Sequence, residues 1–151
     1  MTELDKALSG IKKIGIDTAI IIYFMESNPL YNNLIYNVFQ RISNGSLLGI
    51  TSIITLIEVL IHPIRQGNTK LQEQYTNLLL DSNNFYTISA NSSIAKIAAQ
   101  IRSCYDIRIP DAIQIATAKA NGCEVFLTND INLRRIGDLR VLILDDFRRS
   151  E

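Results

Sequence analysis

The sequence predicts an α/β domain in which helices flank a central, mostly parallel sheet. Two observations predict this fold class: short β-rich runs alternate with longer runs of helical periodicity, and the 151 residues, 47% of them hydrophobic, suit one domain with a real core. The charged fraction of 20% is ordinary and glycine and proline are few, which excludes a disordered or low-complexity chain. We therefore expect a single domain over residues 1–151, with its core at about residues 13–147.

The first half of the chain predicts two strands, each followed by two helices. The runs KIGI and SLLGIT are short and β-rich. Apolar residues with helical spacing, such as Leu30, Leu34 and Val38, lie between them, and an Asn-Gly pair closes that helix. The helix that contains Pro63 is expected to be disturbed or to end there, because proline cannot donate the helical hydrogen bond. In order, the elements are a strand at 13–16, helices at 18–27 and 30–45, a strand at 46–51, and helices at 52–66 and 69–84.

The second half predicts three more strands separated by helices. FYTIS, CEVFLT and RVLIL have the β-branched and aromatic composition of strands. SSIAKIAAQIRSCYD places Ile94, Ile97 and Ile101 on one helix face. The next helix opens at Pro110 and closes with Asn-Gly, the usual asymmetry of helix ends. In order, the elements are a strand at 85–89, helices at 92–106 and 110–122, a strand at 123–128, a short helix at 131–137 and a strand at 140–144.

Four acidic residues lie in unusual positions, next to strands or helices that are otherwise apolar. Asp17 ends the first strand, Glu58 lies inside an apolar helix, Asp111 begins a helix after Pro110, and Asp130 follows the strand CEVFLT. A carboxylate in such a place is costly unless it is paired, solvated or bound to a metal. Parallel α/β sheets bind ligands at the carboxyl ends of their strands. We therefore expect the four acids to converge at that edge.

Three of these acids also suit the start of a helix, with Asp17 and Asp130 as N-caps and the third in a first turn. Only Glu58, in mid-helix, has no such explanation. Its neighbours on the same helix face are expected to be Thr51 and Thr55, forming a polar stripe that faces either a wet cleft or open solvent. Taken singly, each acid can be explained either as an ordinary helix-end or solvated residue or as part of a functional site. The four acids together favour a functional site.

Carboxylates that converge repel one another and cannot all stay ionised alone. A hard divalent cation, Mg²⁺ or Mn²⁺, resolves this because it prefers oxygen ligands. Such an ion activates water and clamps phosphate oxygens, so the residues predict hydrolysis of a phosphate ester. Arg108, Arg134 and Arg135 are candidates for contacting substrate phosphates, with solvation or ion pairing to nearby acids as the alternative.

The chain resembles the PIN-domain family, and within it the small VapC-type toxins. The similarity rests on IGIDTAIIIYFME, TSIITLIEVL, RIPDAIQIATAKANG and VFLTNDINL, which carry the four acids in order. The resemblance implies a three-layer PIN-like nuclease domain and a Mg²⁺- or Mn²⁺-dependent endoribonuclease that leaves 5′-phosphate and 3′-hydroxyl ends. By position it assigns Asp17, Glu58, Asp111 and Asp130 as the catalytic, metal-site residues.

The same resemblance implies supporting residues and partners. Thr128 matches the hydroxyl residue that commonly orients the site. Asn132 stands where many relatives carry a further acid, which leaves the number of metal ions open. Relatives of this size often dimerise and are held inactive by a small antitoxin in a groove near the acids. We therefore expect an RNA substrate, a small antitoxin protein and a homodimer.

Other functions fit the residues less well. A haloacid-dehalogenase-type phosphatase needs a second Asp where Ala19 stands, and a receiver domain needs an acid pair that KKIGID lacks. Two alternatives stay open: a PIN-like RNA-processing nuclease outside toxin–antitoxin systems, and a catalytically weak module that binds metal or RNA. The formal net charge of zero argues against tight non-specific RNA binding.

The chain also carries signals of compartment. It shows no signal peptide and no apolar run of membrane-spanning length, so we expect no membrane association. Cys104 and Cys123 match neither a metal-binding pair nor a disulfide framework, and both are expected to be buried, reduced residues. These features favour a cytoplasmic protein.

Overall fold

A five-stranded parallel sheet lies at the centre of the computed structural model, which describes residues 1–150. Its strands are β1 (Lys13–Ile16), β2 (Leu48–Ser52), β3 (Phe85–Ile88), β4 (Val125–Thr128) and β5 (Arg140–Ile143). The strand order is β3-β2-β1-β4-β5, and every neighbouring pair is parallel. The strands that precede three of the predicted site residues, β1, β2 and β4, are therefore neighbours.

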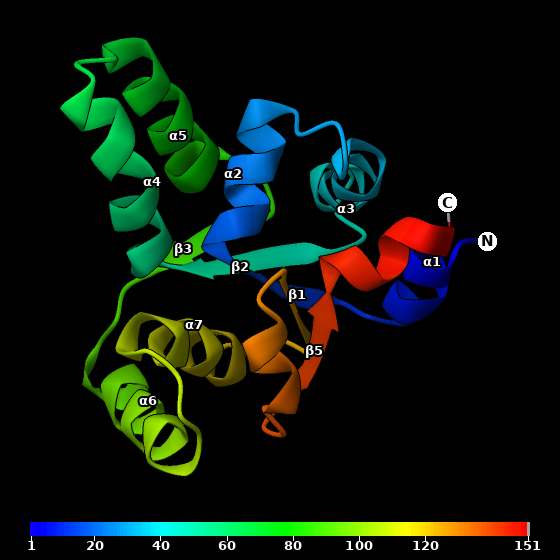
Figure 1. Ribbon diagram of the computed structural model, residues 1–151, viewed down its shortest axis with the longest axis vertical. Helices are drawn as coiled ribbons and strands as arrows, with labels where there is room; N and C mark the ends of the chain where they lie inside the picture. Colours follow the sequence, from blue (N-terminus) through cyan, green and yellow to red (C-terminus); the bar gives the residue numbers. More distant parts are fainter. Residues whose placement is uncertain (151) are drawn as a thin grey trace.

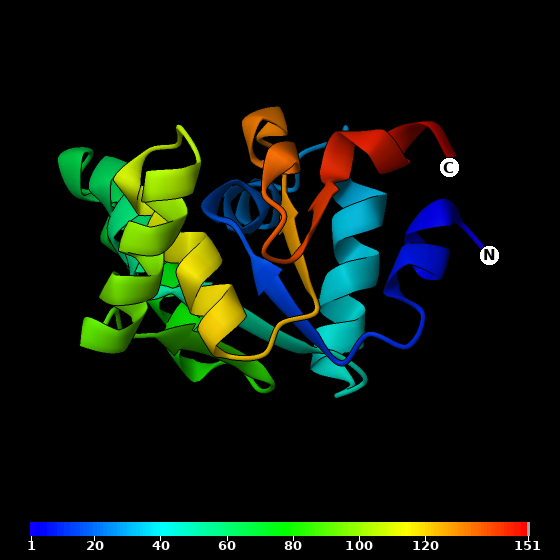
Figure 2. The same cartoon turned by 90° about the horizontal axis from the view of Figure 1, so that it is seen from below.

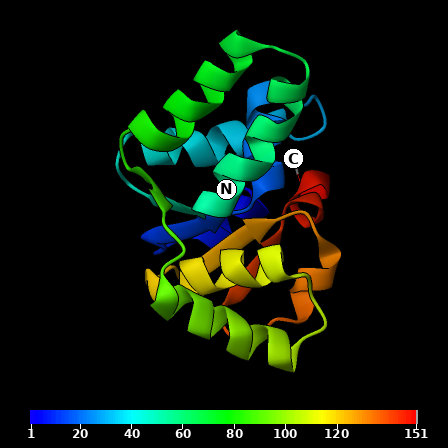
Figure 3. The same cartoon turned by 90° about the vertical axis from the view of Figure 1, so that its left-hand side faces the viewer.

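Helices cover both faces of this sheet. They are α1 (Glu3–Leu8), α2 (Thr18–Glu26), α3 (Asn32–Ser43), α4 (Ile53–Arg65), α5 (Thr69–Asp81), α6 (Ser92–Cys104) and α7 (Ile109–Ala120), with 3₁₀ helices η1 (Ile131–Arg135) and η2 (Leu144–Ser150). Helices α6 and α7 lie on one face, and α2 to α5 lie on the other (Figures 1 and 3). This arrangement confirms the predicted three-layer α/β fold.

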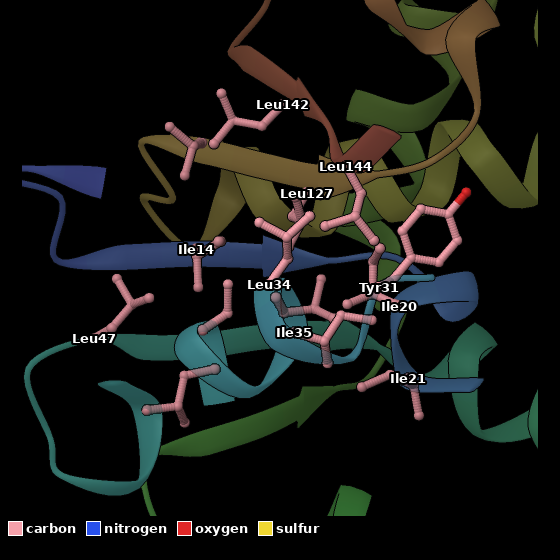
Figure 4. Packing of buried hydrophobic residues seen from close by; sticks show 14 of the residues in the cluster. Ile14, Ile20, Ile21, Tyr31, Leu34, Ile35, Leu47, Leu127, Leu142 and Leu144 are labelled. Atoms are coloured by element: carbon pink, nitrogen blue, oxygen red, sulfur yellow. The ribbon is translucent and has the colours of Figure 1, made fainter. Parts of the chain in front are cut away.

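Each face of the sheet has its own hydrophobic core, because successive strand residues point to opposite faces. On one side Ile14 and Leu127 pack with Ile20 of α2 and Ile35 of α3 (Figure 4). On the other side Phe126 packs in a separate cluster with buried residues of α6 and α7. The cores hold the helices at fixed positions above the sheet, and the last residues of β1, β2 and β4 are fully buried.

Gly15 lets α7 approach the sheet closely. A Cβ at this position would lie 2.7 Å from the Phe126 ring and 2.8 Å from the Cβ of Ala118. Any side chain in the middle of β1 would therefore push α7 outward. Because Asp111 stands in the first turn of α7, this contact also sets the position of a predicted site residue.

The structure differs from the sequence-based prediction at several elements. Helix α1 was not predicted; Thr2 and Asp5 form a capping box there, and α1 lies beside η2 (Figure 2). Leu30, expected inside the second helix, precedes α3 and is 55% exposed. Helix α4, by contrast, ends near Pro63 as predicted, two residues beyond it at Arg65.

Two further findings concern the cysteines and the membrane. Both cysteines are free, as expected, but Cys104 is exposed and only Cys123 is buried, because Cys104 ends α6 on the side away from the core. Within residues 1–150, none of the helices has the length and apolar character needed to cross a bilayer.

Candidate active site

The four predicted acids occupy the carboxyl side of the sheet. Asp17 follows β1 directly, and Asp130 follows β4 after one intervening residue. Glu58 lies on α4, the helix that begins where β2 ends, and Asp111 lies in the first turn of α7. Strands β1, β2 and β4 run parallel and adjacent, so the residues that follow them lie on the same side of the sheet (Figure 1).

Asp17 is the most buried of the four, with 9% of its surface exposed. One carboxylate oxygen caps α2 by accepting the backbone N–H of Thr18 at 2.8 Å. The other accepts the hydroxyl of Thr128 at 2.5 Å. The Thr128 hydroxyl in turn accepts the N–H of Asp130 at 3.1 Å. Asp17 is therefore both a helix cap and one end of a chain of hydrogen bonds that reaches Asp130.

The pKa of Asp17 is raised from 3.8 to about 6. Burial is the main cause, and the hydrogen bonds from Thr128 and Thr18 oppose it. The negative charges of Asp111 and Glu58 raise the pKa further. Three of the predicted acids therefore act on one another electrostatically.

Glu58 is held by a hydroxyl group. Its Oε1 accepts the hydroxyl of Thr18 at 2.7 Å, so the residue after Asp17 bonds directly to Glu58. Thr55 lies one turn earlier on α4 and contacts Thr51 at 2.7 Å. Thr51 belongs to β2, as the strand predicted at 46–51 has it, so the stripe takes its first member from the strand and does not lie along one helix. Thr51 and Thr55 are buried, with 2% and 0% of their surface exposed, whereas Glu58 at the end of the stripe is half-buried.

Asp111 and Asp130 are partly buried and each has a partner within the chain. Arg108 donates its Nε to Asp111 at 3.3 Å. Asp130 caps η1 by accepting the N–H of Asn132 at 3.0 Å. The ordinary N-cap roles foreseen for Asp17 and Asp130 are thus real, and they leave the other lone pairs of these carboxylates available.

A cavity of about 450 Å³ opens beside these two acids. Its wall combines cationic, acidic and amide groups with two apolar residues beneath them. The lining residues are Arg102, Asp106, Ile107, Arg108, Asp111, Asp130, Asn132, Leu133 and Arg135. Arg102 and Asp106 were not selected from the sequence, because nothing in the periodicity of α6 separates Arg102 from any solvated arginine.

The three predicted arginines all contact other parts of the chain. Besides the pair between Arg108 and Asp111, Arg134 binds both carboxylate oxygens of Asp146 at 2.9 Å. Arg135 donates to the backbone carbonyl of Asp106. Arg108 and Arg134 therefore form ion pairs within the chain, which was the alternative to contacting substrate. Both side chains are nevertheless more than half exposed.

Two groups of residues escaped the sequence-based prediction. Gln114 is 2% exposed and donates to Thr18 and Thr55. Its only sequence signal is an amide inside the apolar run AIQIA, one turn after Asp111. Asn129, to which no role was given, donates to the hydroxyls of both Tyr23 and Tyr31.

The potential metal ligands at this edge are carboxylate and hydroxyl oxygens, the ligand atoms that Mg²⁺ and Mn²⁺ prefer. Within residues 1–150, however, no three His, Cys, Asp or Glu side chains already form a group that could hold an ion. Each of three acids instead has a partner within the chain: Thr18 donates to Glu58, Arg108 donates to Asp111, and Asp130 caps η1. The four acids share an edge, and their convergence on one ion stays a prediction.

Comparisons with known proteins bear on this site. The model of the PIN-domain family matches residues 14–139. A VapBC2 complex from Rickettsia felis, bound to a DNA fragment from its promoter, matches with a TM-score of 0.70 and 17% identity over 87% of this chain and 98% of that one. A toxin–antitoxin complex from Klebsiella pneumoniae matches with a TM-score of 0.65 and 23% identity over 88% of this chain and 98% of that one. FitAcB from Neisseria gonorrhoeae matches with a TM-score of 0.64 and 22% identity over 87% and 97%.

These solved structures are less than a quarter identical to this chain, so the likeness to them establishes the fold. A comparison with curated protein sequences gives no significant match.

Proposed function

The chain belongs to the PIN-domain family, and from this premise we propose that it is a Mg²⁺- or Mn²⁺-dependent endoribonuclease and the toxin of a type II toxin–antitoxin pair. Members of this family are nucleases. The observation that carries the proposal is the buried carboxylate of Asp17, whose pKa is raised to about 6 by burial and by the charges of Asp111 and Glu58. Acids that repel one another at the open edge of a sheet make a place where a divalent cation is stabilised.

The residues present fit such an ion, because carboxylate oxygens from Asp17, Glu58, Asp111 and Asp130 would hold it. When bound, the ion supplies Lewis-acid stabilisation of the charge that develops on the phosphate. Thr128 keeps the carboxylate of Asp17 in one orientation through its hydroxyl. These acids are the proposed catalytic residues, and Thr128 and Asn132 are supporting residues.

RNA phosphates would be contacted by the arginines around the cavity, Arg102, Arg108 and Arg135, and by the nearby Arg134. An exposed ion pair is worth about 0–1 kcal/mol, so Arg108 and Arg134 exchange their carboxylate partners for phosphate oxygens at small cost. With a formal net charge of zero, the bulk affinity for RNA is modest, and a bound cation reverses the local sign where phosphate docks.

The proposed partners are a small antitoxin and a second copy of the chain. Complexes of toxin with antitoxin among the structures of similar fold support the antitoxin. The proposed compartment is the cytoplasm, where such an enzyme meets its RNA. Co-expression with the product of a neighbouring reading frame tests this part: rescue of growth supports the toxin role. Cleavage without growth arrest would favour an RNA-processing nuclease outside toxin–antitoxin systems.

The enzymatic part is tested with purified protein and a labelled single-stranded RNA in Mg²⁺ or Mn²⁺, with the matching DNA as substrate control. Asp17→Asn is expected to abolish cleavage, and Asp81→Asn, at an exposed acid at the end of α5, to leave it unchanged. Undiminished, metal-dependent cleavage by Asp17→Asn would overturn the proposal. Binding of Mn²⁺ without any cleavage by the wild type would identify a binding module instead.

A further inference from the structure

A buried amide on α7 lies at the centre of a polar network beneath the acids. Gln114 is 2% exposed, and its Nε2 donates to the Thr55 hydroxyl at 2.7 Å and to the Thr18 hydroxyl at 3.2 Å. Its Oε1 accepts the N–H of Ser52, the N-cap of α4, at 3.4 Å. A side chain of a single residue therefore ties α7 to the first turns of α2 and α4.

The two hydroxyl partners of Gln114 lie close in sequence to proposed catalytic acids. Thr18 follows Asp17 in sequence, and its hydroxyl donates to Glu58 at 2.7 Å. Thr55 lies one turn before Glu58 on α4. Gln114 itself lies one turn after a third acid, Asp111, on α7. The network thus joins the three helices that carry these acids.

A side chain with two N–H donors at this position matches the directions of the surrounding hydrogen bonds. The hydroxyl of Thr51 donates to a backbone carbonyl of β1, so it accepts from Thr55. The hydroxyl of Thr18 donates to Glu58, so its oxygen is left to accept. The oxygens of Thr18 and Thr55 therefore both receive a hydrogen from Gln114, and an amide NH₂ supplies two. An apolar side chain would leave two buried hydroxyls without this donor.

We propose that Gln114 is a positioning residue for the metal site: through Thr18 it fixes the carboxylate of Glu58, and it holds Asp111 at a set distance from Asp17. This inference deepens the proposed function and rests on it. Partners that orient ligand carboxylates typically contribute about 10- to 100-fold in metal affinity or activity. Gln114 touches neither the ion nor RNA, so its effect is transmitted by hydroxyl groups.

The test is Mn²⁺ calorimetry on the full chain, with RNA cleavage measured alongside. Gln114→Met keeps the length of the side chain and removes the amide, and it is expected to raise the Kd for Mn²⁺ by about 10-fold or more. Thr117→Val is the matched control, because Thr117 is equally buried on α7 but bonds only to its own helix. It is expected to leave the Kd unchanged.

A second pair of variants keeps the test decisive if Gln114→Met does not fold. Thr55→Val keeps the shape and loses the hydroxyl, whereas Thr55→Ser keeps the hydroxyl and loses a buried methyl group. Positioning through hydroxyls predicts weaker Mn²⁺ binding for the valine variant and near wild-type binding for the serine variant. Simple packing predicts the reverse, and that result would overturn the inference.

The outcomes separate the inference from the function on which it rests. If the wild type binds Mn²⁺ and cleaves RNA, and folded Gln114→Met binds Mn²⁺ equally well, the positioning role is wrong and the nuclease assignment stands. If the wild type neither binds Mn²⁺ nor cleaves RNA, the proposed function fails and the positioning role falls with it.

Discussion

Replacing Asp17 by Asn should make the metal-free protein more stable while it abolishes cleavage. The native pKa of Asp17 is about 6, against 3.8 as the ordinary value. Ionising this carboxylate in the folded chain at pH 7 therefore costs about 3 kcal/mol relative to the unfolded chain. Asn has nearly the same shape and no charge, so it avoids this cost, but its amide nitrogen cannot accept one of the two hydrogen bonds that Asp17 accepts. The lost hydrogen bond offsets about 1 kcal/mol of the gain, so we expect a net gain of about 1–2 kcal/mol, or roughly 2–8 °C in Tm.

The sign of the pH dependence follows from the raised pKa. Between about pH 4 and pH 6 the unfolded chain releases the Asp17 proton before the folded chain does, so the stability of the wild type falls as pH rises through this window. Below it Asp17 is protonated in both states, and above it the loss is complete. Asp17→Asn lacks this contribution, so the difference in stability between the two proteins should grow from pH 4 to pH 6 and then stay constant.

The assay is thermal unfolding in EDTA across this pH range, repeated with Mn²⁺. Mn²⁺ should raise the Tm of the wild type and leave that of Asp17→Asn nearly unchanged. Asp5→Asn is a control of opposite sign, because hydrogen bonds from Asn37 and from Thr2 lower the pKa of Asp5, so its replacement should destabilise the chain. If Asp17→Asn is clearly less stable than the wild type in EDTA at pH 7.5, the ionised carboxylate of Asp17 does not destabilise the metal-free protein, and this reasoning is refuted.

Three further predictions concern the surroundings of Asp17. Thr128→Val should lower cleavage by about 10- to 100-fold because it removes the hydroxyl that orients Asp17, and Thr128→Ser should restore most of it; equal rates for both variants would contradict this role. Arg108→Ala should raise the KM for cleavage of RNA of any sequence, and in fluorescence anisotropy it should reduce the slope of log affinity against log salt concentration by about one. An unchanged slope would show that this arginine does not contact RNA. Gly15→Ala should lower the free energy of unfolding in denaturant by about 1–3 kcal/mol, because its Cβ would lie 2.7 Å from the Phe126 ring and 2.8 Å from the Cβ of Ala118 on α7. An unchanged free energy of unfolding would show that the ring and α7 move aside freely.

The positions of the acids were predictable because strand ends are visible in the sequence. An apolar run that stops at Asp17, and another that stops just before Asp130, mark the carboxyl edge of a parallel sheet without any tertiary information. Glu58 stood out because a carboxylate in mid-helix has no local explanation. The same reasoning foresaw the caps made by Asp17 and Asp130, but it could not supply distances, and so it did not foresee that the Thr18 hydroxyl would bond to Glu58.

The polar network was beyond sequence reasoning for a different reason. Gln114 and Thr18 are 96 residues apart, and only the packing of α7 against the first turns of α2 and α4 brings them together. Thr51 was predicted as the last residue of the strand at 46–51, and its pairing with Thr87 of β3 confirms this, so the polar stripe with Thr55 and Glu58 crosses from the strand to the helix. The hydrophobic pattern of a sequence predicts which face of a helix or strand is buried, but it does not predict which polar side chains bond to one another.

The terminal elements show the limits of local signals. Helix α1 has only six residues, too few for a periodic pattern, and its capping box of Thr2 and Asp5 was the signal available. Leu30 continued the apolar spacing of α3 but lies before its first residue, where no packing surface reaches it. Such positions depend on the chain around them more than on their own periodicity.

The central claim is that four acids serve one metal-dependent site for RNA hydrolysis. Its most direct test is the initial rate of RNA cleavage in Mn²⁺ by Asp17→Asn, Glu58→Gln, Asp111→Asn and Asp130→Asn, each compared with the wild type and with an EDTA-treated sample. We predict that every variant loses at least about 100-fold, since removing groups that act as a unit costs nearly as much singly as together. Cleavage that survives EDTA, or a variant among the four that keeps the wild-type rate, would contradict the account.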